Sequence, residues 1–227
     1  MATVESERLS QNIVTPEVFN VLKEGDQMTF TLANCNVSTV NAIRRTILSD
    51  IPVIGIRTTP YELNDAVFHV NTSRINNEVL KQRLSCIPVH LRYDNKGYKT
   101  LQLEIDVEND SDEVRYVTTD DFRLMRLNMV GETGGSELTQ QEARKIFPPS
   151  GPPANSPILF TRLRPKLSSD IPGERIKISA KFSLVNAKVD GAFNAVSCAT
   201  FAYSQDVAKQ KMAWAEKLNA LQNANAE

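Results

Sequence analysis

The sequence predicts an α+β fold, in which a sheet with helices on one side is interrupted by a strand-rich inserted domain. Amphipathic helical patterns occupy the two ends of the chain, at residues 37–51 and 206–222, whereas the middle follows the two-residue period of strands. A segment rich in glycine and proline, residues 131–157, lies at the far edge of this strand-rich middle. Helices at both ends and strands between them are the basis of the prediction.

The helix predicted at residues 37–51 organises the rest of the chain. Its apolar face follows helical spacing and consists of Val40, Ile43, Ile47 and Ile51. Asn36 or Ser38 can cap its start, because a short polar side chain accepts a hydrogen bond from a free N–H group of the first turn. Pro52 ends it, since the residue before a proline is disfavoured in the helical region.

Two consecutive arginines, Arg44 and Arg45, lie on or beside this apolar face. Arg44 is next to the face, and Arg45 lies one step round the helix, in line with Asn41. A guanidinium beside a buried face needs a carboxylate or carbonyl partner, because an unpaired buried charge is costly. The arginines can form a salt bridge within the chain or extend their charged ends to solvent. Alternatively, their partner belongs to another protein. Spacing alone leaves both alternatives open.

The other elements are predicted from alternation, from short apolar runs and from turn residues. Strands are predicted at residues 28–32, 53–56, 66–70, 101–107, 114–118, 122–130, 158–163, 175–182 and 193–203. Residues 114–118 are expected to pair back on 101–107 across the turn at 109–112. A second helix is predicted at 74–84, capped by Asn71-Thr-Ser73. The structure of residues 1–24 is left open.

The segment 131–157 is expected to be a long surface insertion, and loops of this length tend to be functional or mobile. Within it, Thr139 and Glu142 form a capping-box pattern that predicts a short helix ending at Phe147. The chain then ends in the helix at 206–222. Its apolar stripe includes Trp214 and Leu218, and this stripe must pack on the body of the protein or on a second chain.

Composition excludes several classes of protein. The chain has 227 residues, of which 41% are hydrophobic and 23% charged, as in an ordinary globular protein of one large or two small domains. A net charge of −1 gives no basic field for a nucleic-acid-binding module. No apolar run approaches the ~20 residues that span a membrane, and the polar N-terminus lacks the core of a signal peptide.

Three widely spaced cysteines, Cys35, Cys86 and Cys198, indicate a reducing compartment with free, mostly buried thiols. No cysteine pair has metal-binding spacing, so no zinc site is indicated, and the predicted protein has no cofactor. The two histidines, His69 and His90, lie in strand-like apolar surroundings, where a structural histidine is commoner than a ligand or a base. A phosphate-binding glycine loop and a Gly-x-Ser-x-Gly motif are both missing.

One enzymatic alternative stays open. Acidic residues gather in two turns, and as carboxylates they could hold a divalent ion in a stand-alone α+β enzyme. They are Asp110, Asp112 and Glu113 in the first turn, and Asp120 and Asp121 in the second. Turn residues of this kind are more simply explained as solvated. The pattern as a whole therefore favours a protein that binds other proteins.

Two blocks of sequence carry a resemblance to a known family. The first block is Phe30-Thr-Leu-Ala-Asn34, followed by Val40-Asn-Ala-Ile-Arg-Arg45 and Ile51-Pro52. The second is Asn71-Thr-Ser73, followed by Asn77-Glu78-Val-Leu and Arg83-Leu-Ser-Cys-Ile-Pro88. Together they resemble the RNA polymerase alpha family, which includes the third-largest subunit of eukaryotic polymerases, the archaeal D subunit and bacterial alpha. Weaker similarity extends over residues 118–124 and 173–203.

The resemblance implies a fold and a role. An alpha-like dimerisation domain would comprise residues 10–52 and 158–227, and an inserted domain would occupy 53–157. Subunits of this family are non-catalytic. They dimerise with a small alpha-like subunit, and the dimer forms the platform on which the two large catalytic subunits of a DNA-directed RNA polymerase assemble for transcription.

The resemblance also implies functions for individual residues. Asn41, Arg44 and Arg45 would contact a large subunit. The dimer interface would include Val40, Ile43, Ile47, Trp214 and Leu218. No direct DNA contact and no membrane contact are expected. The localisation would be intracellular: the nucleus, or the cytoplasm or virion if the source is a large DNA virus.

The family pattern is not complete in this chain. Many relatives carry a cysteine cluster for a metal centre in the inserted domain, and this chain has none. Residues 190–195 replace a segment that makes contacts in other members of the family, so those contacts are not expected in this chain. The sequence does not define the contacts of the loop at 131–157.

Overall fold

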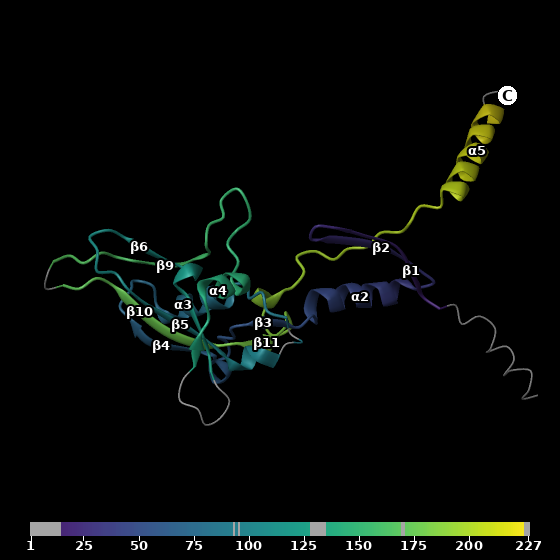
Figure 1. The fold of residues 1–227 in the computed structure, drawn as a ribbon. Helices are drawn as coiled ribbons and strands as arrows, with labels where there is room; N and C mark the ends of the chain where they lie inside the picture. Colours follow the sequence, from purple (N-terminus) through teal and green to yellow (C-terminus); the bar gives the residue numbers. More distant parts are fainter. Residues whose placement is uncertain (1–14, 93, 95, 128–134, 169–170, 225–227) are drawn as a thin grey trace, which may run out of the picture. The chain divides into compact units, whose positions relative to one another are not determined.

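The structure, a computed structural model, describes residues 15–92, 94, 96–127, 135–168 and 171–224. It has the mixed α+β fold that the sequence predicts (Figure 1). The α-helices are α2 (Val37–Ser49), α3 (Asn77–Ser85), α4 (Gln140–Ile146) and α5 (Val207–Ala224). The strands are β1 (Glu17–Glu24), β2 (Gln27–Ala33), β3 (Val53–Gly55), β4 (Ala66–Asn71), β5 (Leu101–Glu108), β6 (Arg115–Thr118), β7 (Arg123–Arg126), β8 (Ser136–Glu137), β9 (Leu159–Leu163), β10 (Arg175–Lys181) and β11 (Ser183–Val185). Short 3-10 turns are η1 (Tyr61–Leu63), η2 (Lys96–Thr100), η3 (Thr119–Asp121) and η4 (Gly191–Phe193).

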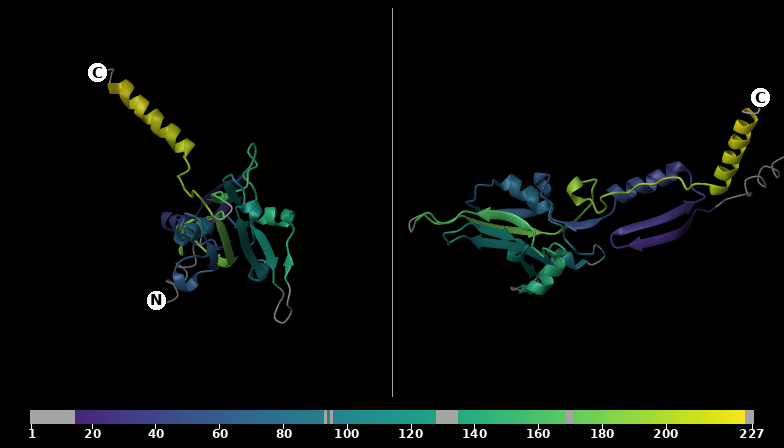
Figure 2. Two further views of the ribbon diagram at one scale, coloured as in Figure 1. Left: turned by 90° about the vertical axis from the view of Figure 1, so that its left-hand side faces the viewer. Right: turned by 90° about the horizontal axis from the view of Figure 1, so that it is seen from above.

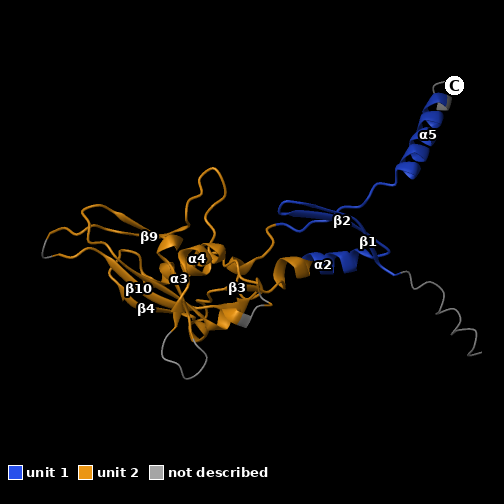
Figure 3. Cartoon of the chain, viewed as in Figure 1, with its two compact units in different colours: residues 1–44, 198–227 blue, residues 45–197 orange. Residues whose placement is uncertain are grey.

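The contacts within the chain divide it into two compact units (Figure 3). The terminal unit comprises residues 1–44 and 198–227, and the central unit comprises residues 45–197. Strands β9 and β10 lie in the central unit because they pair with β6 and β5. These two units are defined only by which residues contact one another. They do not test the domain boundaries at 52/53 and 157/158, which remain a prediction from the family resemblance.

A five-stranded antiparallel sheet forms the centre of the central unit, in the order β4-β10-β5-β7-β8. Figure 1 labels three of its strands, β4, β10 and β5, and Figure 2 shows the unit from two further sides. Strand β10 pairs along its whole length with β5, from Arg175 opposite Glu108 to Lys181 opposite Gln102. The alternation predicted for these two strands is confirmed, because their inward side chains are all buried. These are Leu101, Leu103, Ile105, Val107, Ile176, Ile178 and Ala180.

The outward face of this sheet carries opposite charges on neighbouring strands. Asp106 on β5 accepts hydrogen bonds from Arg175 on β10 at 2.9 and 3.2 Å and pairs with Lys177 at 3.1 Å. Partial burial raises the pKa of the Asp106 carboxyl, but the hydrogen bonds from Arg175 and Lys177 outweigh it and hold the pKa below its ordinary value. These cross-strand pairs stabilise the register in which the apolar face is buried.

Helix α4 shows that residues 131–157 are not simply a surface insertion, although 131–134 lie outside the described residues. The predicted capping box is confirmed, with Thr139 and Glu142 bonded reciprocally. The helix buries Ala143, Ile146 and the following Phe147 in the core. The ring of Phe147 meets that of Phe122 edge-on, with 5.5 Å between the ring centroids. The prediction is wrong for this helix because apolar residues in a short polar segment gain most by joining the nearest core.

Three local predictions are also wrong. Helix α3 begins at Asn77, later than predicted, and its N-cap is Asn76, whose side chain accepts from the N–H group of Val79. Strand β6 pairs with β9, not with β5. Residues 194–203 form no strand; the segment begins in η4, where Phe193 is buried against Gly55. For helix α3 the reason is a better cap at Asn76. For strand β6 and for residues 193–203 the reason is a contact with a distant part of the chain, which outweighs the local pattern.

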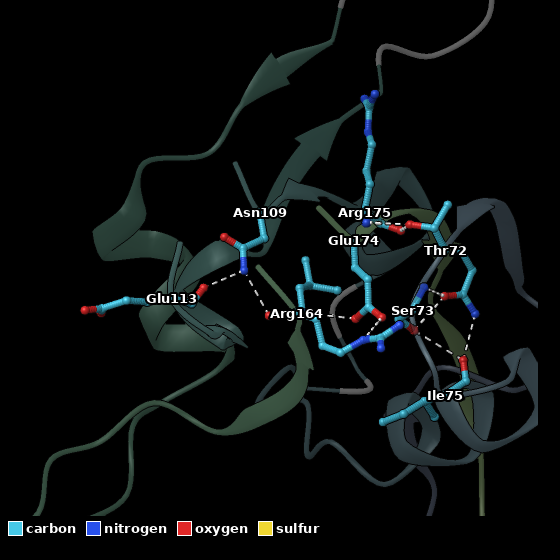
Figure 4. Close-up of polar contacts among 10 residues, drawn as sticks. Thr72, Ser73, Ile75, Asn109, Glu113, Arg164, Glu174 and Arg175 are labelled. Atoms are coloured by element: carbon cyan, nitrogen blue, oxygen red, sulfur yellow. Dashed lines mark hydrogen bonds and ion pairs between the residues drawn. The ribbon is translucent and has the colours of Figure 1, made fainter. Parts of the chain in front are cut away.

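Two Asn-x-Ser turns of the same design support the end of the sheet where β10 starts (Figure 4). The Asn71 side chain accepts from the N–H and hydroxyl groups of Ser73 and donates to the carbonyl of Ile75. The Asn109 side chain makes the same bonds with Ser111 and Glu113. Asn71-Thr-Ser73 is therefore a turn that supports the sheet and does not cap helix α3.

Glu174 lies between these two turns and joins three strands (Figure 4). Its buried carboxylate accepts from the N–H group of Arg164 at 2.8 Å and from the Arg164 guanidinium at 2.6 Å. Its backbone N–H donates to the carbonyl of Arg164, and its carbonyl accepts from the N–H of Asn109. Charge-assisted bonds of this kind fix the ends of β5, β9 and β10 to one another.

Candidate protein interaction site

Helix α2 is the first part of the candidate site, and it forms as the sequence predicts. The side chain of Asn36 accepts hydrogen bonds from the N–H group of Thr39 at 2.8 Å and from its hydroxyl at 2.9 Å. Asn36 rather than Ser38 therefore caps the helix. The helix ends at Ser49, shortly before Pro52.

The predicted dimer residues on α2 lie at helical spacing on one face, and none of them is buried. Val40 and Ile47 are half-buried, and Ile43 is 38% exposed. No residue of α2 is buried. The helix thus has an amphipathic pattern whose apolar face lacks the cover that a core position would have.

The predicted large-subunit contact residues lie on the same helix. The structure brings Asn41 and Arg44 together, because the Arg44 Nε donates to the Asn41 side-chain oxygen at 3.0 Å. Arg45 lies exposed beside them. In the part of the chain that the structure describes, neither arginine forms an ion pair with a carboxylate. The internal salt bridge considered from the sequence is therefore absent among these residues.

The carboxylate that follows α2 is already paired. Asp50 forms an ion pair with Lys188, whose N–H group also donates to the carbonyl of Ser49. The hydrogen bond from Lys188 is the main cause that lowers the pKa of Asp50, with a smaller Coulombic contribution from Arg45. Among the described residues, no acceptor contacts the guanidinium of Arg45 or the terminal nitrogens of Arg44.

Helix α5 holds the other predicted dimer residues. Asp206 caps it by accepting from the N–H group of Lys209 at 3.1 Å. Trp214 is 62% exposed and Leu218 is 53% exposed, and every side chain described in this helix is exposed. With Val207 and Leu221 they form one stripe along the helix.

The terminal unit also contains a β-hairpin of which the sequence predicts only the second strand. Strands β1 and β2 pair antiparallel across a turn at Gly25, whose φ of +56° suits glycine. The sequence contains a pattern typical of a hairpin that could have predicted the first strand: Gly25-Asp26 lies between two runs rich in apolar and β-branched residues. Large apolar side chains of the hairpin lie exposed: Val18, Phe19, Val21, Leu22, Met28 and Phe30.

Three of the five acidic residues considered for a divalent ion, Asp110, Asp120 and Asp121, form ion pairs within the chain. Asp120 forms a two-pronged ion pair with Arg144, at 2.8 and 3.0 Å. Asp121 accepts from the N–H group of Thr118 at 2.8 Å and pairs with Arg115. No group of three metal-ligating side chains occurs within the described ranges. The two aspartates therefore stabilise turn η3 and its neighbours, which gives the enzymatic alternative no support.

The remaining candidates for chemistry are surface residues. His69 is exposed and hydrogen-bonded to the Ser179 hydroxyl at 2.8 Å, and His90 is exposed. The three cysteines are free, as predicted, but the prediction that they are mostly buried is wrong, because Cys86 and Cys198 are exposed and Cys35 is half-buried. Among the helices that the structure describes, none is long and apolar enough to cross a bilayer.

Comparison with known proteins finds relatives over part of the chain. No family model matches it. It is 31% identical over 88 residues, 39% of its length, to the DNA-directed RNA polymerase subunit Rpo3 of Pyrococcus furiosus, and the match covers 31% of that protein. It is 30% identical over 82 residues to the subunit Rpo3 of Pyrococcus horikoshii, which is 36% of this chain and 29% of the relative.

A third relative is a conjugation stage-specific protein of Tetrahymena thermophila, 29% identical over 107 residues, 41% of this chain and 32% of the relative. The matched stretches span less than a third of each relative's length. The two archaeal matches support the resemblance to RNA polymerase alpha-like subunits that the sequence motifs indicate.

Proposed function

We propose that this protein is a non-catalytic, alpha-like subunit of a DNA-directed RNA polymerase. It dimerises with a small alpha-like subunit, and the heterodimer is the platform on which the two large catalytic subunits assemble. The similarity to Rpo3 subunits supports the family. The structure of the terminal unit supports the role, as follows.

One observation carries the proposal: no described residue of the terminal unit is buried, and neither is any residue of helix α2, whose last residues, 45–49, belong to the central unit, although these elements are rich in apolar side chains. Apolar surface of this extent on α2, α5 and the β1–β2 hairpin is unfavourable in water and marks a protein interface. An obligate interface buries about 2,000 Å² or more, which elements of this size can supply together with a partner. We therefore assign Val40, Ile43, Ile47, Trp214 and Leu218 to the dimer interface.

The arginine pair supports the second contact. The Arg44 and Arg45 guanidiniums have no carboxylate partner among the described residues, and two adjacent cations on a rigid helix suit acceptors on another protein. We assign Asn41, Arg44 and Arg45 to the contact with a large subunit. Asn41 orients Arg44 through its hydrogen bond, so it acts as a positioning residue.

The proposed role also implies a location in the cell. It would work wherever the polymerase transcribes, which is the nucleus or, for a large DNA virus, the cytoplasm or the virion. With a net charge of −1, the chain is expected to contact its protein partners and to make no direct contact with DNA.

Native purification of the full chain from its source tests the proposal. We expect it to co-purify with two very large subunits and one small subunit in a complex of several hundred kilodaltons. Purification as a monomer, with its apolar helices protected from limited proteolysis, would refute the proposal.

A further inference from the structure

A shallow groove lies outside the dimer and large-subunit sites, between the end of helix α3 and the start of strand β9. Its volume is about 270 Å³, and its lining is mostly apolar. The lining residues are Gln82, Arg83, Cys86, Ile87, Ile158 and Leu159. The groove is smaller than the roughly 300–1,000 Å³ of pockets that hold small molecules, and it is open, so it suits side chains of a peptide better than a cofactor.

The two sides of the groove follow from how α3 packs. The helix buries Leu80 and Leu84 in the core, and Ile87 follows them at its end. This orientation leaves Arg83 and Cys86, which lie one turn apart, on the side that faces β9. Across the groove, Leu159 is 46% exposed although it begins a strand. An apolar floor and wall are thus open to solvent.

One charge in the groove has no counterpart. Arg83 is half-buried, and within the described part of the chain no carboxylate pairs with it. Six other arginines in the described residues pair their guanidinium with a carboxylate: Arg92, Arg115, Arg123, Arg144, Arg164 and Arg175. A half-buried guanidinium beside apolar surface is most favourable when a carboxylate joins it from outside.

We propose that this groove binds a peptide segment of another polymerase subunit that presents an aliphatic side chain next to an aspartate or glutamate. The aliphatic side chain covers Ile158 and Leu159, and the carboxylate pairs with Arg83. The partner named here rests on the proposed function, but the groove belongs to the central unit and is separate from the residues assigned to dimerisation.

Cys86 makes the groove directly testable, because its exposed thiol is part of the lining. In a full-length chain with Cys35→Ser and Cys198→Ser, Cys86 is the remaining cysteine. We expect a maleimide to modify Cys86 at least tenfold more slowly in the purified polymerase complex than in the free chain. A photo-crosslinker attached at Cys86 should then capture a peptide of another polymerase subunit that contains an acidic and an aliphatic residue.

A matched pair of variants tests the role of the charge. Arg83→Glu should restore the reactivity of Cys86 in the complex, whereas Arg74→Glu makes the same charge change at an exposed residue outside the groove and should leave Cys86 protected. Thermal unfolding checks that both variants are folded; Arg74→Glu should leave the unfolding temperature unchanged, whereas Arg83→Glu should lower it modestly, because Arg83 lies in the last turn of α3, where a cation is favoured over a carboxylate.

The possible results separate this inference from the proposed function. A complex that assembles with Cys86 as reactive as in the free chain would overturn the inference and leave the proposed function standing. Crosslinking to a second copy of this chain would overturn the proposed occupant. A chain that joins no polymerase subunit would overturn both.

Discussion

The side chain of Trp214 provides the sharpest test of the proposed dimer interface. Within this chain it is 62% exposed, and a tryptophan offers about 200 Å² of surface, so a partner that covers it removes about 125 Å² from water. At about 25 cal/mol per Å² this is worth about 3 kcal/mol. We expect Trp214→Ala to raise the dissociation constant for the small alpha-like subunit on the order of 100-fold.

Met212→Ala is the matched control on the same helix. Met212 is 67% exposed, and it lies about 200° round the helix from Trp214, away from the stripe. Isothermal titration of each full-length variant with the small subunit measures the two dissociation constants, and thermal unfolding measures whether folding is unaffected. Neither variant should change stability by more than about 0.5 kcal/mol, because both side chains are exposed. Equal loss of binding in both variants, or no loss in Trp214→Ala, would refute the assignment of this helical face.

Three further predictions concern the arginine pair and the central unit. Arg45→Glu should leave folding and small-subunit pairing intact but prevent recruitment of the large subunits, as measured by co-purification; a complete polymerase containing this variant would contradict the role of Arg45. Gly173→Ala should lower the free energy of unfolding by about 3 kcal/mol or more, as measured by chemical denaturation, because its Cβ would lie 1.7 Å from the Asn109 carbonyl oxygen. The control Gly151→Ala meets no atom within 4 Å and should leave this free energy nearly unchanged. Asp106→Asn should lower stability at neutral pH, and its difference from the unmodified chain should begin to shrink as the pH falls below the unfolded pKa of about 3.9. The pKa of Asp106 is lower in the folded state, so its contribution is present above the unfolded pKa and is lost on acidification through the folded pKa; a stability difference that does not shrink on acidification would contradict this.

The candidate site was partly accessible from the sequence. The apolar faces of α2 and α5 and the arginine pair are local patterns, and the structure places them on helices at nearly the predicted bounds. The groove at Arg83 was not predicted, because it forms only when strand β9 lies against a helix that precedes it by about 75 residues in the chain. Strand β1 was missed because Asn20, with a φ of +53°, creates a bulge that breaks the alternation.

The sequence by itself determined which segments are helices and strands wherever a period of 2 or 3.6 residues was sustained, as in β5, β10, α2 and α5. It also determined the capping box at Thr139 and limited the cap of α2 to Asn36 or Ser38, because a cap involves only neighbouring residues; the structure shows that Asn36 is the cap. The tertiary structure alone decided that β6 pairs with β9 and that α4 joins the core. The physical reason is that periodicity and capping are local interactions, whereas the choice of a strand's partner and the burial of a short helix depend on apolar surface supplied by distant parts of the chain.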